Sequence, residues 1–177
     1  YTQNNDVQQF YSYTLTPLNS GISSLWSDNY QALYEVNSVI NGVTNNEGLS
    51  DSFQKQITGE MEVVRALYYF NMVNLFGGVP LVTTTNYRET SHIPRATADA
   101  IYTQVKTDLA DARIKLTASY PSAGRARPNL YTAVALPAKV NLYLGNWQSA
   151  YDEADSVINS AAGLKVVYST CAICIRH

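Results

Sequence analysis

Apolar residues fill most positions between residues 61 and 76, within the stretch GEMEVVRALYYFNMVNLFGGVPLV at residues 59–82. The run lacks the alternation of a half-buried strand, and it is too polar and too short for a membrane span, which needs about 20 mostly apolar residues. Apolar side chains all round a helix need cover on more than one side, so the pattern predicts the central helix of an α-helical protein. Gly77 and Gly78 end this helix, and Pro80 blocks its continuation.

A helix before the central one is expected to run from Ser23 or Ser24 to Asn41, with Gly42 ending it. Its inner face is formed by Trp26, Tyr30, Leu33, Val36, Asn37 and Ile40. Asn37 must find hydrogen-bond partners if it is buried, so we interpret it as a structural residue. The central helix then begins at an N-cap supplied by Ser50, Asp51 or Ser52. Its inner faces are expected at Phe53, Ile57, Met61, Val64, Tyr68 and Val73.

Three more helices are expected after an extended segment, VPLVTTTN, and a loop that contains His92. Thr97 caps the first of them, at residues 98–116. Its buried stripe is formed by Ile101, Val105, Leu109, Ala112 and Leu116. Pro137 should kink or divide the second helix, at residues 130–145, and the third begins at or just before Trp147.

The last two helices are similar to a helix hairpin of the tetratricopeptide type. Ala138, Ala150 and Ala154 are small residues that let two helices approach closely, and Gly145 permits the tight turn between them. The sequence therefore predicts an all-α fold, a helical bundle or superhelix with tetratricopeptide-like hairpins and long loops.

The chain of 177 residues is long enough for a single domain with a real core. We divide it into a polar, aromatic loop at residues 1–21, a helical body at residues 22–163 and an atypical tail at residues 164–177. A net charge of −2 argues against nucleic acid as a partner, because a basic face is expected there. Cys171 and Cys174 in the tail lack the further ligands that a zinc site needs, so we expect no metal and no cofactor.

Charged residues in the helices do not form a catalytic set. Glu60 and Glu62 lie two positions apart on a helix, so they point about 200° apart and cannot flank one glycosidic bond as an acid/base pair. Glu62 and Arg65 are instead spaced for a local ion pair, as are Asp111 and Lys115.

The loops give no catalytic set either. His92 has no accompanying nucleophile motif. Arg125 and Arg127 are expected to be solvated or bonded to the backbone, as loop arginines usually are. The sequence therefore predicts a protein that is not an enzyme.

The amino-terminal segment is the candidate for ligand contact. Phe10, Tyr11 and Tyr13 stand close together without a helical period that would bury them as one stripe. Exposed rings beside Asn and Gln are typical of sugar sites, where rings stack on apolar C–H faces and amides bond to hydroxyl groups. Alternatively, the segment folds back over the helices as a lid, and both interpretations stay open.

Four segments in order resemble the SusD/RagB family of outer-membrane glycan-binding lipoproteins of Bacteroidetes. LWSDNYQALYEVNSVI resembles the family's first signature helix, and residues 59–82 resemble its most recognisable motif. RATADAIYTQVKTDLADA and AKVNLYLGNWQSAYDEADSVI complete the set, so the resemblance covers roughly residues 10–163. The tail after Leu164 does not resemble the family.

The resemblance implies a non-catalytic protein that binds oligosaccharides or polysaccharides at the cell surface, as a lid on a SusC-like TonB-dependent outer-membrane transporter. It also implies anchoring by a lipid on a cysteine expected to precede this chain. Family sites use aromatic residues ahead of the first signature helix, which favours Phe10, Tyr11 and Tyr13, with Asn5, as glycan-binding residues. Family members are considerably longer, so we expect this chain to be an amino-terminal portion. A tetratricopeptide-type scaffold for protein–protein interaction is the alternative function.

Overall fold

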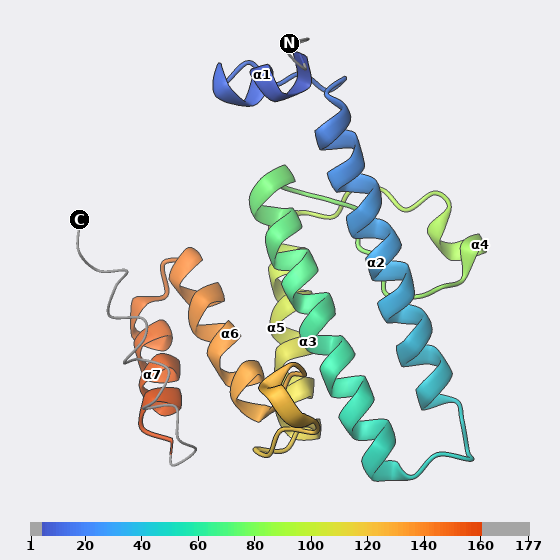
Figure 1. Cartoon of the computed structure of the whole chain (residues 1–177), viewed down its shortest axis with the longest axis vertical. Coiled ribbons are helices and arrows are strands. Elements are labelled where there is room, and N and C mark those ends of the chain that lie inside the picture. The colour runs from blue at the N-terminus through green and yellow to red at the C-terminus, as the bar shows by residue number, and fades with distance from the viewer. Residues whose placement is uncertain (1–4, 161–177) are drawn as a thin grey trace.

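The computed structural model describes residues 5–160, which form helices packed around one long central helix (Figure 1). The elements in order are α1 (Asn5–Tyr11), α2 (Ser20–Thr44), α3 (Asp51–Phe76), α4 (Tyr87–Thr90), α5 (Ala98–Lys115), the 3-10 turn η1 (Ala123–Arg125), α6 (Leu130–Tyr143) and α7 (Trp147–Ile158). Within residues 5–160 the β-type pairing is limited to an isolated antiparallel bridge between Pro80 and Arg95. The predicted all-α class is confirmed, while the predicted tail with its two cysteines lies outside the described residues.

Helix α3 is the central helix that the sequence predicts. It packs against α2 on one side and against α5 and α6 on the others (Figure 1). Its N-cap is Ser50, whose side chain accepts from the backbone of Phe53, and Gly77 ends it with a φ of 69°. Phe53 was expected to face the core but is 48% exposed. Leu116, the residue after the end of α5, approaches α3 at Gly59, so Phe53 lies nearly two turns beyond the part of α3 that α5 covers.

Helix α2 begins earlier and ends later than the sequence pattern indicates. Asn19 is its N-cap, so Ser20 already belongs to the helix. Gly42 lies inside the helix, because a single glycine in a helix interior costs only about 1 kcal/mol. Trp26 packs against the core as expected, with its ring edge-on to Phe76 at a centroid distance of 5.2 Å.

The extended segment after α3 is fastened by side chains from two helices. The Tyr69 hydroxyl donates to the Val82 carbonyl at 2.8 Å and accepts from the Val82 amide at 2.7 Å. The Asn37 amide also donates to the Val82 carbonyl, at 3.0 Å, and the Tyr30 hydroxyl donates to the Pro80 carbonyl at 2.8 Å. The structural role predicted for the buried Asn37 is therefore confirmed.

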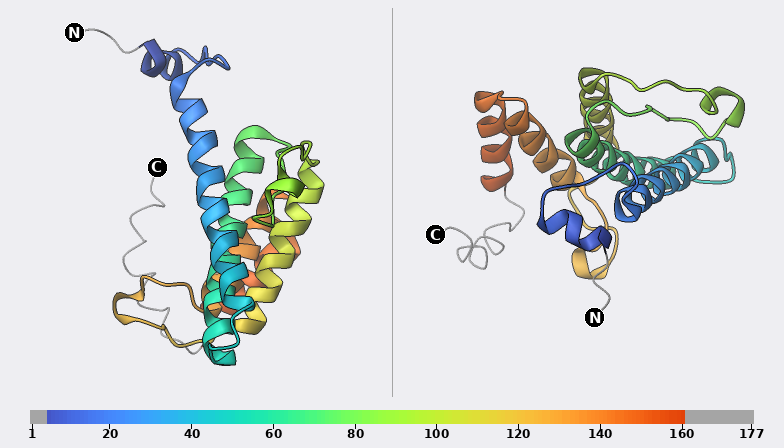
Figure 2. Two further views of the ribbon diagram at one scale, coloured as in Figure 1. Left: turned by 90° about the vertical axis from the view of Figure 1, so that its right-hand side faces the viewer. Right: turned by 90° about the horizontal axis from the view of Figure 1, so that it is seen from above.

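Helix α5 and the α6–α7 hairpin complete the body (Figure 2). Thr97 caps α5 and the whole predicted stripe of α5 is buried, as expected. Gly145, with a φ of 75°, makes the turn before α7, which begins at Trp147 as predicted. Pro137 does not divide α6, which continues from Leu130 to Tyr143, so of the two predicted effects the division is wrong. Packing on both sides outweighs the roughly 3 kcal/mol cost of an interior proline.

Candidate functional site

An exposed aromatic surface, formed by Phe10, Tyr11 and Tyr13, lies at the end of the molecule where α1 projects beyond the other helices (Figures 1 and 2). Phe10 is 47% exposed, Tyr11 82% and Tyr13 94%. The loop expected at residues 1–21 contains helix α1, which carries Phe10 and Tyr11 in its last turn. The side chain of Asn5, the fourth residue expected at this site, lies outside the described residues.

Asn19 connects the aromatic surface to the body of the protein. This fully buried residue caps α2, because its side-chain oxygen accepts from the backbone amides of Gly21 and Ile22. Its side-chain nitrogen donates to the Asp6 carbonyl at 3.0 Å and to the Gln9 side chain at 3.1 Å. One amide therefore bonds to the first turn of α2 and to two residues of α1.

Asp6 adds a second connection between the two helices. Its carboxylate accepts from the Ser20 amide at 3.2 Å and from the Ser20 hydroxyl. A negative charge at this position also complements the positive end of the α2 dipole. The Phe10 ring lies against the same turn, since a methyl group added at Gly21 would meet it at 3.5 Å.

Tyr13 is held outward by an uncommon backbone conformation. Its φ is 55°, in the left-handed region that non-glycine residues seldom adopt. Hydrogen bonds on either side support this turn, from Ser12 to the Gln8 carbonyl and from Thr14 to the Gln9 carbonyl, both at 3.0 Å. A residue held in such a conformation is a reason to ask what its side chain does.

The lid interpretation of the aromatic segment is wrong for Tyr11 and Tyr13, because their rings do not cover the helices. Only Phe10 is partly covered, at the turn before α2. The hydroxyl groups of Tyr11 and Tyr13 make no hydrogen bond within residues 5–160. Tyrosine offers a large, rigid contact area that also hydrogen-bonds, at little cost in conformational entropy. Chemically, this surface suits a ligand with both apolar faces and hydroxyl groups.

The charged residues of α3 pair across helices rather than along one helix. Arg65 donates to both carboxylate oxygens of Asp108 in α5, at 2.8 and 2.6 Å, and to the Asn37 side chain at 3.0 Å. The predicted Glu62–Arg65 pair is therefore wrong. The partner of Glu62 is Lys115, so the predicted Asp111–Lys115 pair is wrong as well.

The loop arginines differ from expectation in one case. Arg127 pairs with Glu60, with nitrogen–oxygen distances of 2.8 and 2.9 Å, rather than being solvated. Arg125 lies with its guanidinium carbon 5.4 Å from the centre of the Tyr120 ring. Glu60 and Glu62 thus bind separate cations.

Burial controls the protonation of these internal groups. Desolvation alone would lower the pKa of Arg65, but hydrogen bonds to Asp108 and the charges of Asp108 and Glu62 raise it overall. Desolvation raises the pKa of Glu62 despite Lys115, and one oxygen of Glu62 has no hydrogen-bond partner within the described residues. Desolvation also raises the pKa of Tyr69 to about 12. These groups join α3 to its neighbours and do not open onto the aromatic surface.

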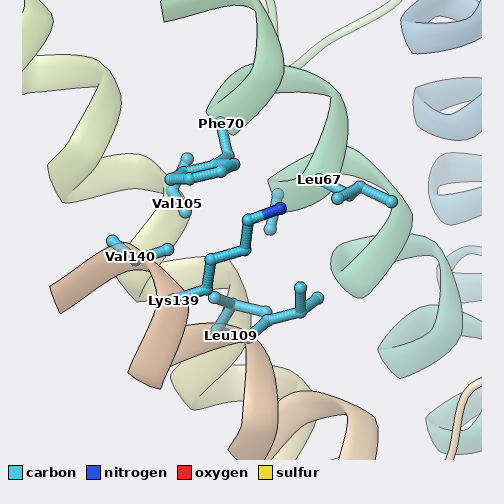
Figure 3. Close-up of a pocket in the computed structure, with 8 residues that line it drawn as sticks. Leu67, Phe70, Val105, Leu109, Lys139 and Val140 are labelled. Atoms are coloured by element: carbon cyan, nitrogen blue, oxygen red, sulfur yellow. The ribbon is translucent and has the colours of Figure 1, made fainter. Parts of the chain in front are cut away.

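A small cavity between α3, α5 and α6 is too small for a ligand. Its volume is about 10 Å³, room for about one water molecule (Figure 3). Figure 3 shows Lys139 reaching from α6 toward α3, with its long apolar stem alongside Leu109 and its end near Phe70. The Lys139 nitrogen lies 5.3 Å from the centre of the Phe70 ring.

Two further findings concern the described part of the chain alone. Residues 5–160 contain no group of three or more His, Cys, Asp or Glu side chains arranged to hold a metal ion. None of their helices has the length and apolar character needed to cross a membrane. His92 is exposed in the loop that carries α4.

The comparison with protein families identifies one that spans most of the chain. A family model described as starch-binding and associating with the outer membrane matches residues 1–142. The SusD-like protein P25 of Formosa agariphila is 30% identical over 141 residues, which are 79% of this chain and 27% of that protein. A SusD-like protein of Bacteroides ovatus is 27% identical over 152 residues, covering 83% of this chain and 27% of that protein.

Solved structures share the same fold. A laminarin-binding SusD-like protein is 30% identical with a TM-score of 0.84, over 92% of this chain and 36% of that chain. A SusD superfamily protein from Bacteroides vulgatus is 25% identical with a TM-score of 0.81, over 91% of this chain and 34% of that chain. The chain thus spans roughly a quarter to a third of the length of these relatives.

Proposed function

The chain belongs to the SusD-like family, whose members are helical carbohydrate-binding proteins, and from this premise we propose that it is the amino-terminal portion of a non-catalytic glycan receptor. In this role it recognises an oligosaccharide or polysaccharide at the bacterial cell surface. Because the relatives are longer, the glycan and the partners of the whole protein are part of the proposal.

One observation carries the assignment of the contact residues. Tyr11 and Tyr13 are the most exposed aromatic side chains at the end that carries α1, and hydrogen bonds from Asn19 hold this end in place. Exposing two rings to water costs solvation energy, which a bound sugar offsets by covering their faces. We assign the glycan contacts to Phe10, Tyr11, Tyr13 and Asn5.

Affinity electrophoresis tests the proposal directly. The protein is run in native gels that contain a soluble polysaccharide, with laminarin included because a relative of similar fold binds it. Retardation relative to a gel without polysaccharide is the expected result. Absence of retardation by every polysaccharide in a broad panel, with the helical circular dichroism spectrum intact, would contradict the proposal.

The same proposal places the protein in an uptake system. We infer that it acts with a SusC-like TonB-dependent transporter at the outer membrane, where it covers the transporter as a lid and passes the glycan on. The support is the family's description as associating with the outer membrane. Affinity purification from outer-membrane extracts should recover such a transporter. An assay for new reducing ends should detect no cleavage of a bound polysaccharide.

A second function is favoured by the exposed face of the α6–α7 hairpin. Leu142, Trp147 and Tyr151 are 50%, 68% and 66% exposed and line an open hollow together with the small Ala150. Such a surface on a tetratricopeptide-like hairpin suits a helix of another protein. Substitution of Trp147 by Ala should weaken the binding of a protein partner and leave polysaccharide binding unchanged. This variant therefore distinguishes the two functions.

A further inference from the structure

A groove of about 350 Å³ lies between α2, α3 and α6, and its α2 and α3 residues come from the halves of these two helices that are nearer to α1 in Figure 1. Its volume lies within the roughly 300–1,000 Å³ of small-molecule sites. Its lining residues are Leu25, Asn29, Phe70, Asn71, Asn74, Leu75, Lys139 and Tyr143. The lining combines three amide side chains and one lysine with apolar and aromatic walls, and it contains no carboxylate.

The amides in the groove are partly fixed and partly available. The Asn74 nitrogen donates to the Phe70 carbonyl at 2.6 Å, and its oxygen accepts from the Tyr102 hydroxyl at 3.0 Å. The Asn29 nitrogen donates to the Leu25 carbonyl at 2.6 Å, which leaves the Asn29 oxygen as an acceptor. Exposed Asn71 makes no side-chain hydrogen bond within residues 5–160, so both its oxygen and its nitrogen are available.

An aromatic ring and a cation complete the groove. Tyr143 is 57% exposed, and its ring meets that of the buried Phe70 edge-on at 5.0 Å, which limits its motion. Lys139 forms no ion pair within the described residues. Its side chain lines the groove, and its nitrogen, 5.3 Å from the centre of the Phe70 ring, is therefore available as a donor for a ligand.

We propose that this groove is a second glycan subsite, in which a sugar unit rests against Tyr143 and exchanges hydrogen bonds with Asn71, Asn29 and Lys139. The proposal rests on the glycan-binding function proposed above and adds residues from three helices to it. An apolar helix of a partner protein would remove water from these polar groups and would offer no hydrogen bonds in place of those that the water made. A ligand that carries many hydroxyl groups replaces them, while its C–H faces cover the ring.

The position of the groove supports a continuous binding path. Figure 1 shows α1 at the same end of the molecule as the last turn of α3, which supplies Asn74 to the groove. A glycan chain that contacts the aromatic surface can therefore continue toward the groove. Lys139 also suits a sugar that carries a carboxylate, because an anion gains from an unpaired cation.

The test uses Tyr143→Ala and Asn71→Ala, with Tyr34→Ala as a matched control. Tyr34 is also 57% exposed and does not line the groove. Binding to neutral laminarin and to acidic polygalacturonate is measured by affinity electrophoresis and calorimetry. Both groove variants should bind about five- to tenfold more weakly than the control, the effect of losing one hydrogen bond or ring contact. If Lys139→Gln weakens binding to polygalacturonate alone, the sugar in the groove is acidic. If it weakens binding to both polysaccharides equally, the sugar is neutral.

Failure of the groove proposal and failure of the glycan-binding proposal give different results. If the Tyr143→Ala and Asn71→Ala proteins bind like Tyr34→Ala while Tyr11→Ala is impaired, the groove is not a subsite and the glycan-binding function stands. If the unmodified protein binds no polysaccharide at all, both proposals are wrong.

Discussion

Substitution of Asp108 by Asn should destabilise the protein strongly, although the two side chains have nearly the same size and shape. The carboxylate accepts two hydrogen bonds from Arg65 and one from Gln104, and only 3% of the Asp108 side chain and 10% of the Arg65 side chain are exposed. The amide removes the negative charge and leaves the guanidinium buried without a counter-ion. Loss of one partner of a buried ion pair costs about 3–5 kcal/mol. This is a fifth or more of a typical free energy of unfolding of about 5–15 kcal/mol.

Chemical and thermal unfolding, followed by far-ultraviolet circular dichroism, measure this loss. A loss of 3–5 kcal/mol corresponds to a fall in Tm of about 6–20 °C for a chain of this size. Asp111→Asn is the matched control, because Asp111 lies one turn away on α5, is exposed and should change stability by less than about 0.5 kcal/mol. Equal stabilities of the two variants would refute the reasoning that the Arg65–Asp108 pair joins α3 to α5.

Three further predictions concern a helix cap, a buried carboxylate and a pair of glycines. Asn19→Ala should lower the free energy of unfolding by about 1–2 kcal/mol in urea titrations, because it removes the α2 cap; no change would contradict the capping role. Burial raises the pKa of Glu62, so the folded state favours its protonated form, and this contribution to stability is present below the unfolded pKa and lost as pH rises through the folded pKa. The stability of Glu62→Gln relative to the unmodified protein should thus increase from pH 4 to pH 8, and a constant or falling difference would count against it. Gly42→Ala should stabilise the protein by about 0.5–1 kcal/mol, since open space surrounds this helical glycine. Gly78→Ala should destabilise the protein, because the added methyl group would lie 2.4 Å from the Ala96 carbonyl oxygen. Shifts of the unfolding midpoint in the same direction for both variants would refute this.

The helices were predictable wherever the sequence carries a local signal. Ser50 and Thr97 cap α3 and α5 at the expected positions, and the spacing of apolar residues identified the buried stripe of α5. Helix α1 was missed because seven residues contain too few turns to show a period. Asn19 falls within the loop expected at residues 1–21, although asparagine is also a strong N-cap residue.

The pairing of buried charges could not be predicted, because the partners are distant in the sequence. Arg65 and Asp108 are 43 positions apart, whereas sequence spacing indicates only pairs within one helix. The aromatic surface was half predictable. Composition singled out Phe10, Tyr11 and Tyr13, but their exposure depends on the bonds between α1 and Asn19, which only the fold reveals.

The most direct test of the account is polysaccharide binding by a Tyr11→Ala/Tyr13→Ala double variant. The control is a Tyr34→Ala/Tyr87→Ala double variant, which removes two exposed rings, 57% and 78% exposed, from elsewhere on the surface. Isothermal titration calorimetry should show binding weakened by about tenfold or more in the first variant and unchanged in the control, as expected for two lost ring contacts of about 1 kcal/mol each. Equal affinity of the two variants for the bound polysaccharide would contradict the assignment of the glycan site to the aromatic surface.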